Sequence, residues 1–283
     1  MSELQWTPQE YQLVDFGEGR KLERFGKMLL DRPSPAALGM RKQALSLWRD
    51  ADVVLSDSDE QCAFDLQWTT RCGPLVFQLK LTPFGHVGVF PEQVDNWRWL
   101  TEETQAIADG RTLSALNLFA YTGGMTLALA ASGVHVIHCD ASAPAVAWAR
   151  QNAAASGLDE RPIRWITEDA RKFVSRELRR GNHYDFVIMD PPSYGHGPSG
   201  RRWEIARDLP QLLEESLQLL NQNECSRLLV TGHSSVPSDS DIAAFIHKLS
   251  PLARLQQYRL TLEDGAMRHL DAGFCIRARW SSK

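Results

Sequence analysis

The most restrictive feature of this chain is a regular alternation of strand and helix patterns that begins after residue 112. Apolar runs typical of buried strands lie at 114–119, 134–139, 163–166, 184–189 and 227–231. Helical patterns lie at 124–132, 143–156, 170–180, 209–220 and 239–249. Such alternation predicts an α/β fold with a parallel sheet and right-handed crossovers.

Two further strands, at 256–262 and 273–280, close the chain without a full helix between them, which predicts an antiparallel hairpin at the sheet edge. The segment before the alternation has a different pattern. Short strands are expected there at 11–16, 52–55, 63–68 and 74–81, and helices at 22–28 and 37–48. We therefore expect a small strand-rich α+β domain over 1–95 that helps to form a substrate cleft, and a ligand-binding domain over 96–283.

Composition excludes several classes of function. No apolar run reaches the roughly 20 residues that cross a bilayer, and the polar segment 1–10 lacks the apolar stretch of a signal peptide. We therefore expect a cytoplasmic protein with no membrane partner. The five cysteines are scattered without a CxxC pair, so no metal is expected. The formal net charge of −4 predicts no general attraction to nucleic acid.

The segment Asp190-Pro191-Pro192-Ser193-Tyr194 directly follows the fourth strand of the alternation. In an open α/β sheet, ligands bind at the carboxyl ends of the strands. Proline lacks an N–H donor, so we expect nearby backbone carbonyls to stay free to accept hydrogen bonds. With the Asp190 carboxylate and the Tyr194 ring, these acceptors suit a planar group that carries an amine. The alternative is a strand that simply ends in a proline turn.

The first three strands also end in residues that suit an adenosine ligand. Gly123 and Gly124 follow the first strand, where glycine lets the backbone approach a ligand closely. Asp140 ends the second strand and can accept hydrogen bonds from ribose hydroxyls. Asp169 follows the third strand and can accept one from an adenine amine. Helix capping is the alternative role for both acids, but with Asp190 they predict an adenosine-type ligand at the topological switch point.

Residues 84–93 combine glycines, aromatic rings and polar side chains just before the second predicted domain. Clefts between domains are preferred ligand sites. We therefore expect this segment, with Phe90 and Gln93, to cover the cofactor. An ordinary linker is the alternative interpretation.

Four motifs stand together in this chain: LNLFAYTGG at 116–124, CDAS at 139–142, EDA at 168–170 and DPPSYG at 190–195. The combination resembles the class I S-adenosylmethionine-dependent methyltransferases, and within them the bacterial large-subunit ribosomal RNA cytosine-5 methyltransferases. The segment GHVGVFPEQ at 85–93 resembles the start of that family's catalytic domain, so the likeness covers about residues 75–283. It implies a Rossmann-like seven-stranded methyltransferase sheet, a small N-terminal α+β domain, and S-adenosylmethionine as cofactor.

The resemblance also implies roles for individual residues. Phe119, Tyr121 and Gly123 would line the methionine part of the cofactor, Asp140 would bind the ribose, and Asp169 the adenine amine. Thr122, Ala141 and Ala170 are further cofactor-binding candidates. Asp190 would face both the methyl group and the acceptor, with Pro191, Pro192 and Tyr194 as the other candidate catalytic residues.

The chain departs from that family in two places. Its members have a nucleophilic cysteine after the fifth strand, but the residues here are Thr231-Gly232-His233-Ser234-Ser235, and no cysteine follows Pro192. Carbon-5 of cytosine needs activation by a thiolate, and Cys139 would lie inside the ribose site, so methylation at that carbon is not expected. Because the sequence starts close to the family-like region, we also expect it to lack the family's N-terminal PUA domain.

The favoured function is a methyltransferase that acts on RNA, specifically ribosomal RNA, at a base nitrogen. Tyr194 would stack the base, and His233 would either remove a proton or be structural. Arginine-rich segments near 171–180 and 201–202 would contact phosphate, or are simply solvated helix faces. A small-molecule methyltransferase on the same scaffold is the second hypothesis. A non-catalytic adenosine-ligand sensor or RNA-binding protein is the third.

Overall fold

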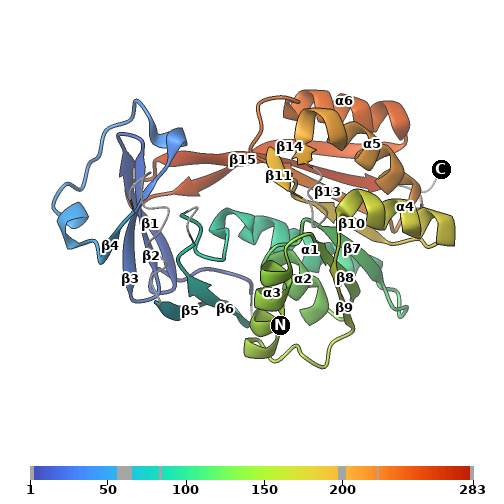
Figure 1. Ribbon diagram of the computed structural model, residues 1–283, viewed down its shortest axis with the longest axis horizontal. Helices are drawn as coiled ribbons and strands as arrows, with labels where there is room; N and C mark the ends of the chain where they lie inside the picture. Colours follow the sequence, from blue (N-terminus) through green and yellow to red (C-terminus); the bar gives the residue numbers. More distant parts are fainter. Residues whose placement is uncertain (1–2, 56–65, 83–84, 197–201, 222, 281–283) are drawn as a thin grey trace. The chain divides into compact units, whose positions relative to one another are not determined.

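The computed structural model describes residues 3–55, 66–82, 85–196, 202–221 and 223–280 (Figure 1). The chain forms two compact units. The first contains Met1–Arg98, Gln151–Gly157 and Leu260–Ala272, and the second contains Trp99–Arg150, Leu158–Arg259 and Gly273–Lys283. The first unit therefore takes two short segments from later in the chain. The domain boundary at residue 95 and the substrate-cleft role of the first domain stay predictions.

The second unit is built around a seven-stranded sheet with the order β14-β15-β13-β10-β7-β8-β9 (Figure 1). The strands are β7 (Ser114–Leu118), β8 (His135–Asp140), β9 (Ile163–Thr167), β10 (Phe186–Met189), β13 (Arg227–Gly232), β14 (Ala253–Glu263) and β15 (His269–Trp280). The five strands from β13 to β9 in this order pair in parallel, and β15 is antiparallel to β13. The predicted α/β class and seven-stranded Rossmann-like sheet are confirmed.

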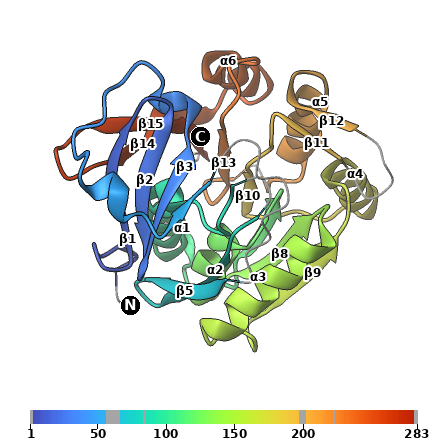
Figure 2. The ribbon, with the colours of Figure 1, turned by 60° about the vertical axis from the view of Figure 1, so that its left-hand side comes forward.

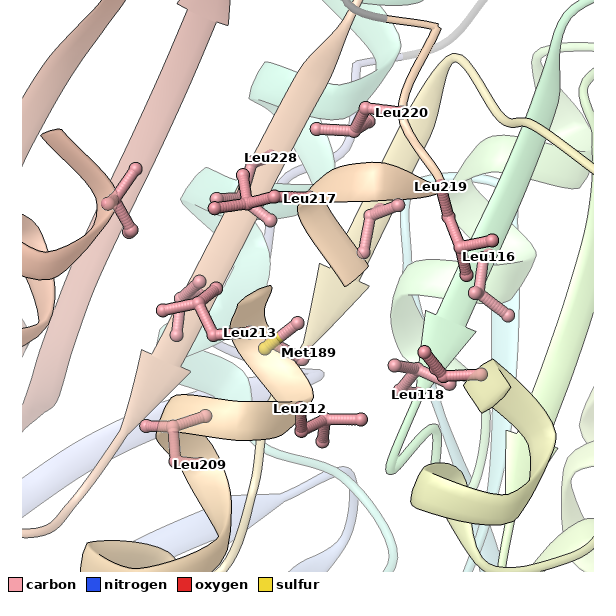
Figure 3. Packing of buried hydrophobic residues seen from close by; sticks show 14 of the residues in the cluster. Leu116, Leu118, Met189, Leu209, Leu212, Leu213, Leu217, Leu219, Leu220 and Leu228 are labelled. Atoms are coloured by element: carbon pink, nitrogen blue, oxygen red, sulfur yellow. The ribbon is translucent and has the colours of Figure 1, made fainter. Parts of the chain in front are cut away.

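Helices cover both faces of this sheet. They are α1 (Val94–Ile107), α2 (Gly124–Ala131), α3 (Ala143–Ala155), α4 (Ala170–Arg180), α5 (Ile205–Gln218) and α6 (Asp239–Leu249). On one face, leucines of α5 at helical spacing pack on alternate residues of β7, β10 and β13, because side chains two apart on a strand share a face. Figure 3 shows Leu209, Leu212, Leu213 and Leu217 beside Leu116, Leu118, Met189 and Leu228.

The strand residues that alternate with this set point to the other face of the sheet, which α1, α2 and α3 cover. Asn117 of β7 donates a hydrogen bond to Thr126 of α2, and Arg150 of α3 lies over the Trp165 ring of β9. Figure 2 shows α3 along the β8 and β9 end of the sheet. Between β10 and α5, the chain also forms a short antiparallel hairpin of β11 (Tyr194–His196) and β12 (Arg202–Glu204), which the sequence did not predict.

The first unit holds a four-stranded sheet of β1 (Tyr11–Gly17), β2 (Arg20–Phe25), β3 (Met28–Pro33) and β4 (Val53–Val54), and a hairpin of β5 (Gln67–Cys72) and β6 (Leu75–Lys80). The helices predicted at 22–28 and 37–48 are wrong. Residues 22–28 belong to the β2–β3 hairpin, and the described chain over 37–48 has only short 3-10 turns. Part of the strand predicted at 63–68 lies outside the described residues.

Two features explain the hairpin in place of a helix. Gly26 has a φ of +57°, a left-handed conformation that glycine adopts readily and that turns the chain. Glu23 is fully buried and accepts hydrogen bonds from Tyr11 and Arg32, so the strand has a polar residue on its buried side. Burial alone would raise the pKa of Glu23, but Arg32 and Lys21 bring it to about 2.

No helix among the described residues is both long and apolar enough to traverse a lipid bilayer.

One buried ion cluster ties α1 to two strands of the second unit. Glu103 of α1 accepts hydrogen bonds from Arg227 of β13 and from Arg279 of β15, the latter at 2.7 Å from Nε. Burial raises the pKa of Glu103, but the two guanidinium groups outweigh it and hold the pKa below its ordinary value. The carboxylate is therefore ionised at neutral pH and stabilises the packing of α1 on the sheet.

We predict that Glu103→Ala lowers the free energy of unfolding by about 3 kcal/mol, because it leaves the buried Arg227 charge without its partner. Urea denaturation at pH 7 would measure this loss. Because the folded-state pKa is depressed, the contribution is present above the ordinary carboxyl pKa and fades as the pH falls through the folded value. Exposed Glu102→Ala is the control, and equal effects of the two variants would contradict the assignment.

Candidate functional site

The loop after β7 has an unusual backbone. Phe119 and Tyr121 have φ values of +54° and +47°, and Gly123 has +94°. A side chain at position 123 would also place its Cβ 3.2 Å from the Cβ of Ala149 on α3. Left-handed conformations in non-glycine residues are uncommon and cluster at ligand sites. The loop therefore marks this strand end as a candidate site.

Asp140 holds this loop from the neighbouring strand. Its Oδ2 accepts a hydrogen bond from the Tyr121 N–H at 2.8 Å, and its Oδ1 accepts one from the Ser142 N–H at 2.8 Å. Burial raises the pKa of this carboxyl, and these two backbone donors oppose the shift. Each carboxylate oxygen has a second lone pair. Asp140 can therefore accept two more hydrogen bonds, as a pair of ribose hydroxyls requires.

Asp169 caps a helix, which was the alternative to adenine binding considered for it above. It is the N-cap of α4, and its carboxylate accepts from the Arg171 backbone N–H at 2.9 Å. The Arg171 guanidinium also binds both carboxylate oxygens, at 3.0 and 2.6 Å. Burial raises the pKa of Asp169, but Arg171 outweighs it and lowers the pKa. Adenine binding by Asp169, with Ala170 buried beside it at the start of α4, stays a prediction.

Asp190 follows β10 at the same edge of the sheet. Its Oδ1 accepts a hydrogen bond from the Thr231 hydroxyl at 2.7 Å, and Thr231 lies on the adjacent strand β13. Burial raises the pKa of Asp190, while His233 and the Thr231 hydroxyl lower it. The Thr231 contact fixes one oxygen and orients the carboxylate. This role of Thr231 was not predicted from the sequence, although its place near the end of a strand was a usable signal.

From the sequence we expected free carbonyl groups along the proline segment, but some of them accept hydrogen bonds within the protein. The Pro192 carbonyl accepts from the Trp203 indole N–H at 2.7 Å, and the Ser193 carbonyl accepts from the Ile205 N–H at 3.0 Å. Across the described part of the chain, no hydrogen bond reaches the carbonyls of Asp190 and Pro191. The expectation is therefore wrong for the end of the segment, and the open acceptors are at its beginning.

Trp203 is a second residue that the sequence analysis missed. Its ring centroid lies 4.8 Å from that of Phe119, and the guanidinium carbon of Arg171 lies over the Trp203 ring, 5.6 Å from its centroid. It thus connects the β11–β12 hairpin to the loop after β7. Tyr194, the predicted stacking residue, has 76% of its surface exposed, so its ring is accessible to a partner. Pro191 is buried and Pro192 is exposed.

The structure brings most of the predicted site residues to one edge of the sheet. Those of the second unit are Phe119, Tyr121, Thr122, Gly123, Asp140, Ala141, Asp169, Ala170, Asp190, Pro191, Pro192 and Tyr194, at or just after the ends of β7, β8, β9 and β10. Phe90 and Gln93 belong to the first unit, where Gln93 accepts from Asn96 at 2.7 Å, so their role stays a prediction. Phe84 lies outside the described residues.

Three of the five arginines that the structure describes in the basic segments are bound to acids. Arg171 pairs with Asp169 and Asp208, Arg176 with Glu168, and Arg180 with Glu177. Their charges are therefore largely balanced within the protein. Arg201 lies outside the described residues. The described part of the chain contains no cluster of three or more His, Cys, Asp or Glu side chains suited to a metal ion.

The residues at this edge fit the sugar of an adenosyl ligand. The left-handed conformations in the loop after β7 allow its backbone to approach a ligand closely. Each carboxylate oxygen of Asp140 has a remaining lone pair that can accept a hydrogen bond from a hydroxyl group. Open carbonyls and an oriented carboxylate stand beside it at Asp190 and Pro191. One edge of the sheet thus combines a nucleoside-type site with acceptors for an amine.

Comparison with solved structures supports this interpretation. A SAM-dependent methyltransferase from Agrobacterium tumefaciens is 32% identical with a TM-score of 0.88, over 99% of this chain and 96% of that one. SMU.776, solved in complex with SAH, shares the fold with a TM-score of 0.67 at 15% identity, over 96% of this chain and 76% of that one.

Curated relatives match a smaller part of the chain. The Ribosomal RNA large subunit methyltransferase I of Photobacterium profundum is 39% identical over 124 residues, 41% of this chain and 31% of that protein. The protein of the same name from Erwinia tasmaniensis is 32% identical over 155 residues, 52% of this chain and 37% of that protein. This chain therefore matches only about a third of the length of these relatives.

The family model described as S-adenosylmethionine-dependent methyltransferase matches residues 56–226, which is more than half of the chain. This match and the relative from Agrobacterium confirm the resemblance drawn from the four motifs. The protein belongs to the S-adenosylmethionine-dependent methyltransferases and uses S-adenosylmethionine as its methyl donor.

Proposed function

We propose that this methyltransferase acts on RNA, specifically ribosomal RNA, at a base nitrogen. The observation that carries the proposal is the Asp190 carboxylate, oriented by Thr231 and followed by open carbonyls at Asp190 and Pro191. Hydrogen-bond acceptors of this kind suit an amine or a ring N–H of a planar base. The names of the curated ribosomal RNA methyltransferases support the choice of substrate class.

S-adenosylmethionine supplies an activated methyl group when bound, so the protein's task is mainly to position the acceptor. Asp190 would accept a hydrogen bond from the target nitrogen and shift electron density toward it. Tyr194, with its exposed ring, would stack on the base. His233, two residues after Thr231, is exposed and within electrostatic reach of Asp190, and would accept the proton that the nitrogen loses.

The cysteines favour nitrogen over carbon as the acceptor atom. None of the cysteines in the described part of the chain follows β13 directly or lies in the segment 190–196. Burial raises the pKa of the Cys139 thiol, which keeps it protonated, and Cys275 is fully buried on β15. Without a thiolate at the acceptor, carbon-5 of cytosine would lack the activation that it needs. A base nitrogen has its own lone pair and needs none.

We predict that Asp190→Asn lowers methyl transfer to RNA at least about a hundredfold at saturating cofactor, because it removes an oriented negative charge from the acceptor site. The measurement is tritium transfer from labelled cofactor to RNA from cells that lack the gene. Exposed Asp159→Asn is the matched control and should retain full activity.

Three outcomes would contradict the proposed substrate. Transfer to a metabolite extract but not to RNA would favour the small-molecule hypothesis. Cofactor binding without any transfer would favour a non-catalytic role. Mass spectrometry of the labelled nucleoside would identify the atom, and a methyl group on carbon would exclude nitrogen.

Asp190 must be ionised to place a negative charge beside the target nitrogen, so activity should fall at acidic pH. The Thr231 hydroxyl lowers the pKa of Asp190. We predict that Thr231→Val raises this pKa and moves the acid limb of the pH–rate profile to higher pH, whereas Thr231→Ser keeps the wild-type profile. A Thr231→Val profile that is reduced in height but unmoved on the pH axis would contradict this role.

Gly123 tests the cofactor half of the site. We predict that Gly123→Ala weakens S-adenosylmethionine binding about tenfold, since a Cβ must fit a left-handed backbone against Ala149. Isothermal calorimetry would measure the affinity. Gly133→Ala is the matched control, because Gly133 has a similar φ of +86° but open space around its Cβ position. Equal affinity losses in both variants would show that backbone strain alone is responsible.

A further inference from the structure

The β11–β12 hairpin, which directly precedes α5 (Figure 2), has one buried and one exposed face. Gly195 and Trp203 pair across the hairpin and therefore share a face. Trp203 is 5% exposed and packs against Phe119, so this face is the inner one. Tyr194 and Arg202, which precede these two residues in the sequence, lie on the outer face, and both are exposed.

Arg202 is a close neighbour of Tyr194 on the outer face. Tyr194 pairs with Glu204 in the register of the hairpin, and Arg202 lies two residues before Glu204 on the same strand. Arg202 is therefore diagonal to Tyr194, and diagonal neighbours are roughly 7–8 Å apart, within reach of aromatic and long side chains. The guanidinium group can thus contact a ligand that is stacked on the Tyr194 ring.

Ion pairs occupy the other charged groups around Arg202. Glu204 pairs with Arg207 at 3.6 Å, and Arg207 also pairs with Asp208 at 2.7 Å. Asp208 binds Arg171 as well, at 3.0 Å. In the ranges that the structure describes, no acidic side chain forms an ion pair with Arg202. Its charge is therefore available to a ligand, whereas the charges of its neighbours are balanced.

The backbone of Arg202 is held in place although its side chain is exposed. Its carbonyl accepts hydrogen bonds from Arg207 at 2.8 Å and from Arg171 at 3.5 Å. The next residue, Trp203, donates its indole N–H to the Pro192 carbonyl. Because the backbone is already ordered, a ligand that binds the side chain has less conformational entropy to overcome, which is the advantage of a preorganised site.

The outer face of the hairpin suits a nucleotide together with its phosphate. An aromatic ring such as Tyr194 gives a base a surface on which to stack, and a guanidinium binds phosphate oxygens through two parallel hydrogen bonds. In RNA every base is joined through its ribose to a phosphate, so an aromatic ring beside an arginine matches the two ends of one nucleotide. Phosphate contacts position the chain, whereas contacts to the base determine which base is chosen.

We propose that Arg202 binds the phosphate next to the acceptor base while Tyr194 stacks on that base. The inference rests on the proposed function, because it takes RNA as the acceptor. It assigns phosphate binding to a single arginine rather than to the whole of the basic segments 171–180 and 201–202. The acceptor nucleotide is then held at its phosphate, at the face of its base, and at the nitrogen whose hydrogen bond Asp190 accepts.

The salt dependence of RNA binding tests this proposal. Each phosphate contact releases counterions, so the logarithm of the affinity falls with the logarithm of the salt concentration in proportion to the number of contacts. Arg202→Gln should weaken binding about tenfold at low salt, the equivalent of one hydrogen bond to a charged group. The slope should become shallower by about 0.7, the value for one phosphate of a single strand.

Filter binding with S-adenosylhomocysteine present would measure affinity and slope without turnover. The RNA is ribosomal RNA from cells that lack the gene. In methyl transfer to the same RNA, Arg202→Gln should raise the KM for RNA and leave kcat unchanged, because the residue holds the phosphate and does not touch the reacting atoms.

Two further variants control for charge and for geometry. Arg179→Gln removes the same charge from an exposed position in the last turn of α4, at the opposite end of this helix from Asp169, and should leave affinity and slope unchanged. Arg202→Lys keeps the charge but not the planar pair of donors, so it should retain the slope and lose part of the affinity. All three variants should have the Tm of wild type, because both side chains are exposed.

A slope for Arg202→Gln equal to that of wild type would overturn the proposal. An equally large change in Arg179→Gln would also overturn it, since general attraction between charges would then account for both. These results leave the proposed function intact as long as the wild-type protein methylates RNA. If the wild-type protein transfers no methyl group to RNA, the proposed function fails and the role of Arg202 fails with it.

Discussion

The hydrogen bond from the Tyr121 N–H to the Asp140 carboxylate is the contact on which the candidate site depends. It joins the ends of β7 and β8, two neighbours in the parallel sheet. Left-handed conformations cost a non-glycine residue about 1–2 kcal/mol each, and both Phe119 and Tyr121 adopt one. The loop can keep this shape only if the surrounding structure compensates. One carboxylate therefore shapes the loop and also presents its remaining lone pairs to a ligand.

The acceptor half of the site is built differently. Asp190 depends on a side-chain hydroxyl of Thr231, so its partner is β13 rather than β8. The strands that carry the two halves, β7 with β8 and β10 with β13, share one sheet. Among the residues that the structure describes, none donates a hydrogen bond to both Asp140 and Asp190. Cofactor affinity and acceptor chemistry can consequently be changed by separate substitutions. This separation lets binding and transfer be measured as independent properties of the same protein.

The sheet and the positions of Asp140, Asp169 and Asp190 could be predicted from sequence, because apolar periodicity locates strands and parallel strands end at a common edge. Contacts across long stretches of sequence could not. The Trp203 indole N–H donates a hydrogen bond to the Pro192 carbonyl. Trp203 lies on the β11–β12 hairpin, whose sequence has no strong apolar pattern. The spacing of Leu22, Phe25 and Leu29 is helical, yet tertiary pairing of β2 with β1 and β3 overrides it.

The paired arginines bear on how such a protein would recognise RNA. A phosphate group that approached Arg171 would compete with Asp169 and Asp208, which already bind it at 2.6 and 3.0 Å. Breaking those contacts would leave the largely buried Asp169 carboxylate without its guanidinium partner and Asp208 with Arg207 alone, at a cost that a phosphate contact would first have to offset. With a net charge of −4, general electrostatic attraction is also small. Selectivity for an RNA acceptor would therefore come from the fit of a base at Asp190 and Tyr194 rather than from charge.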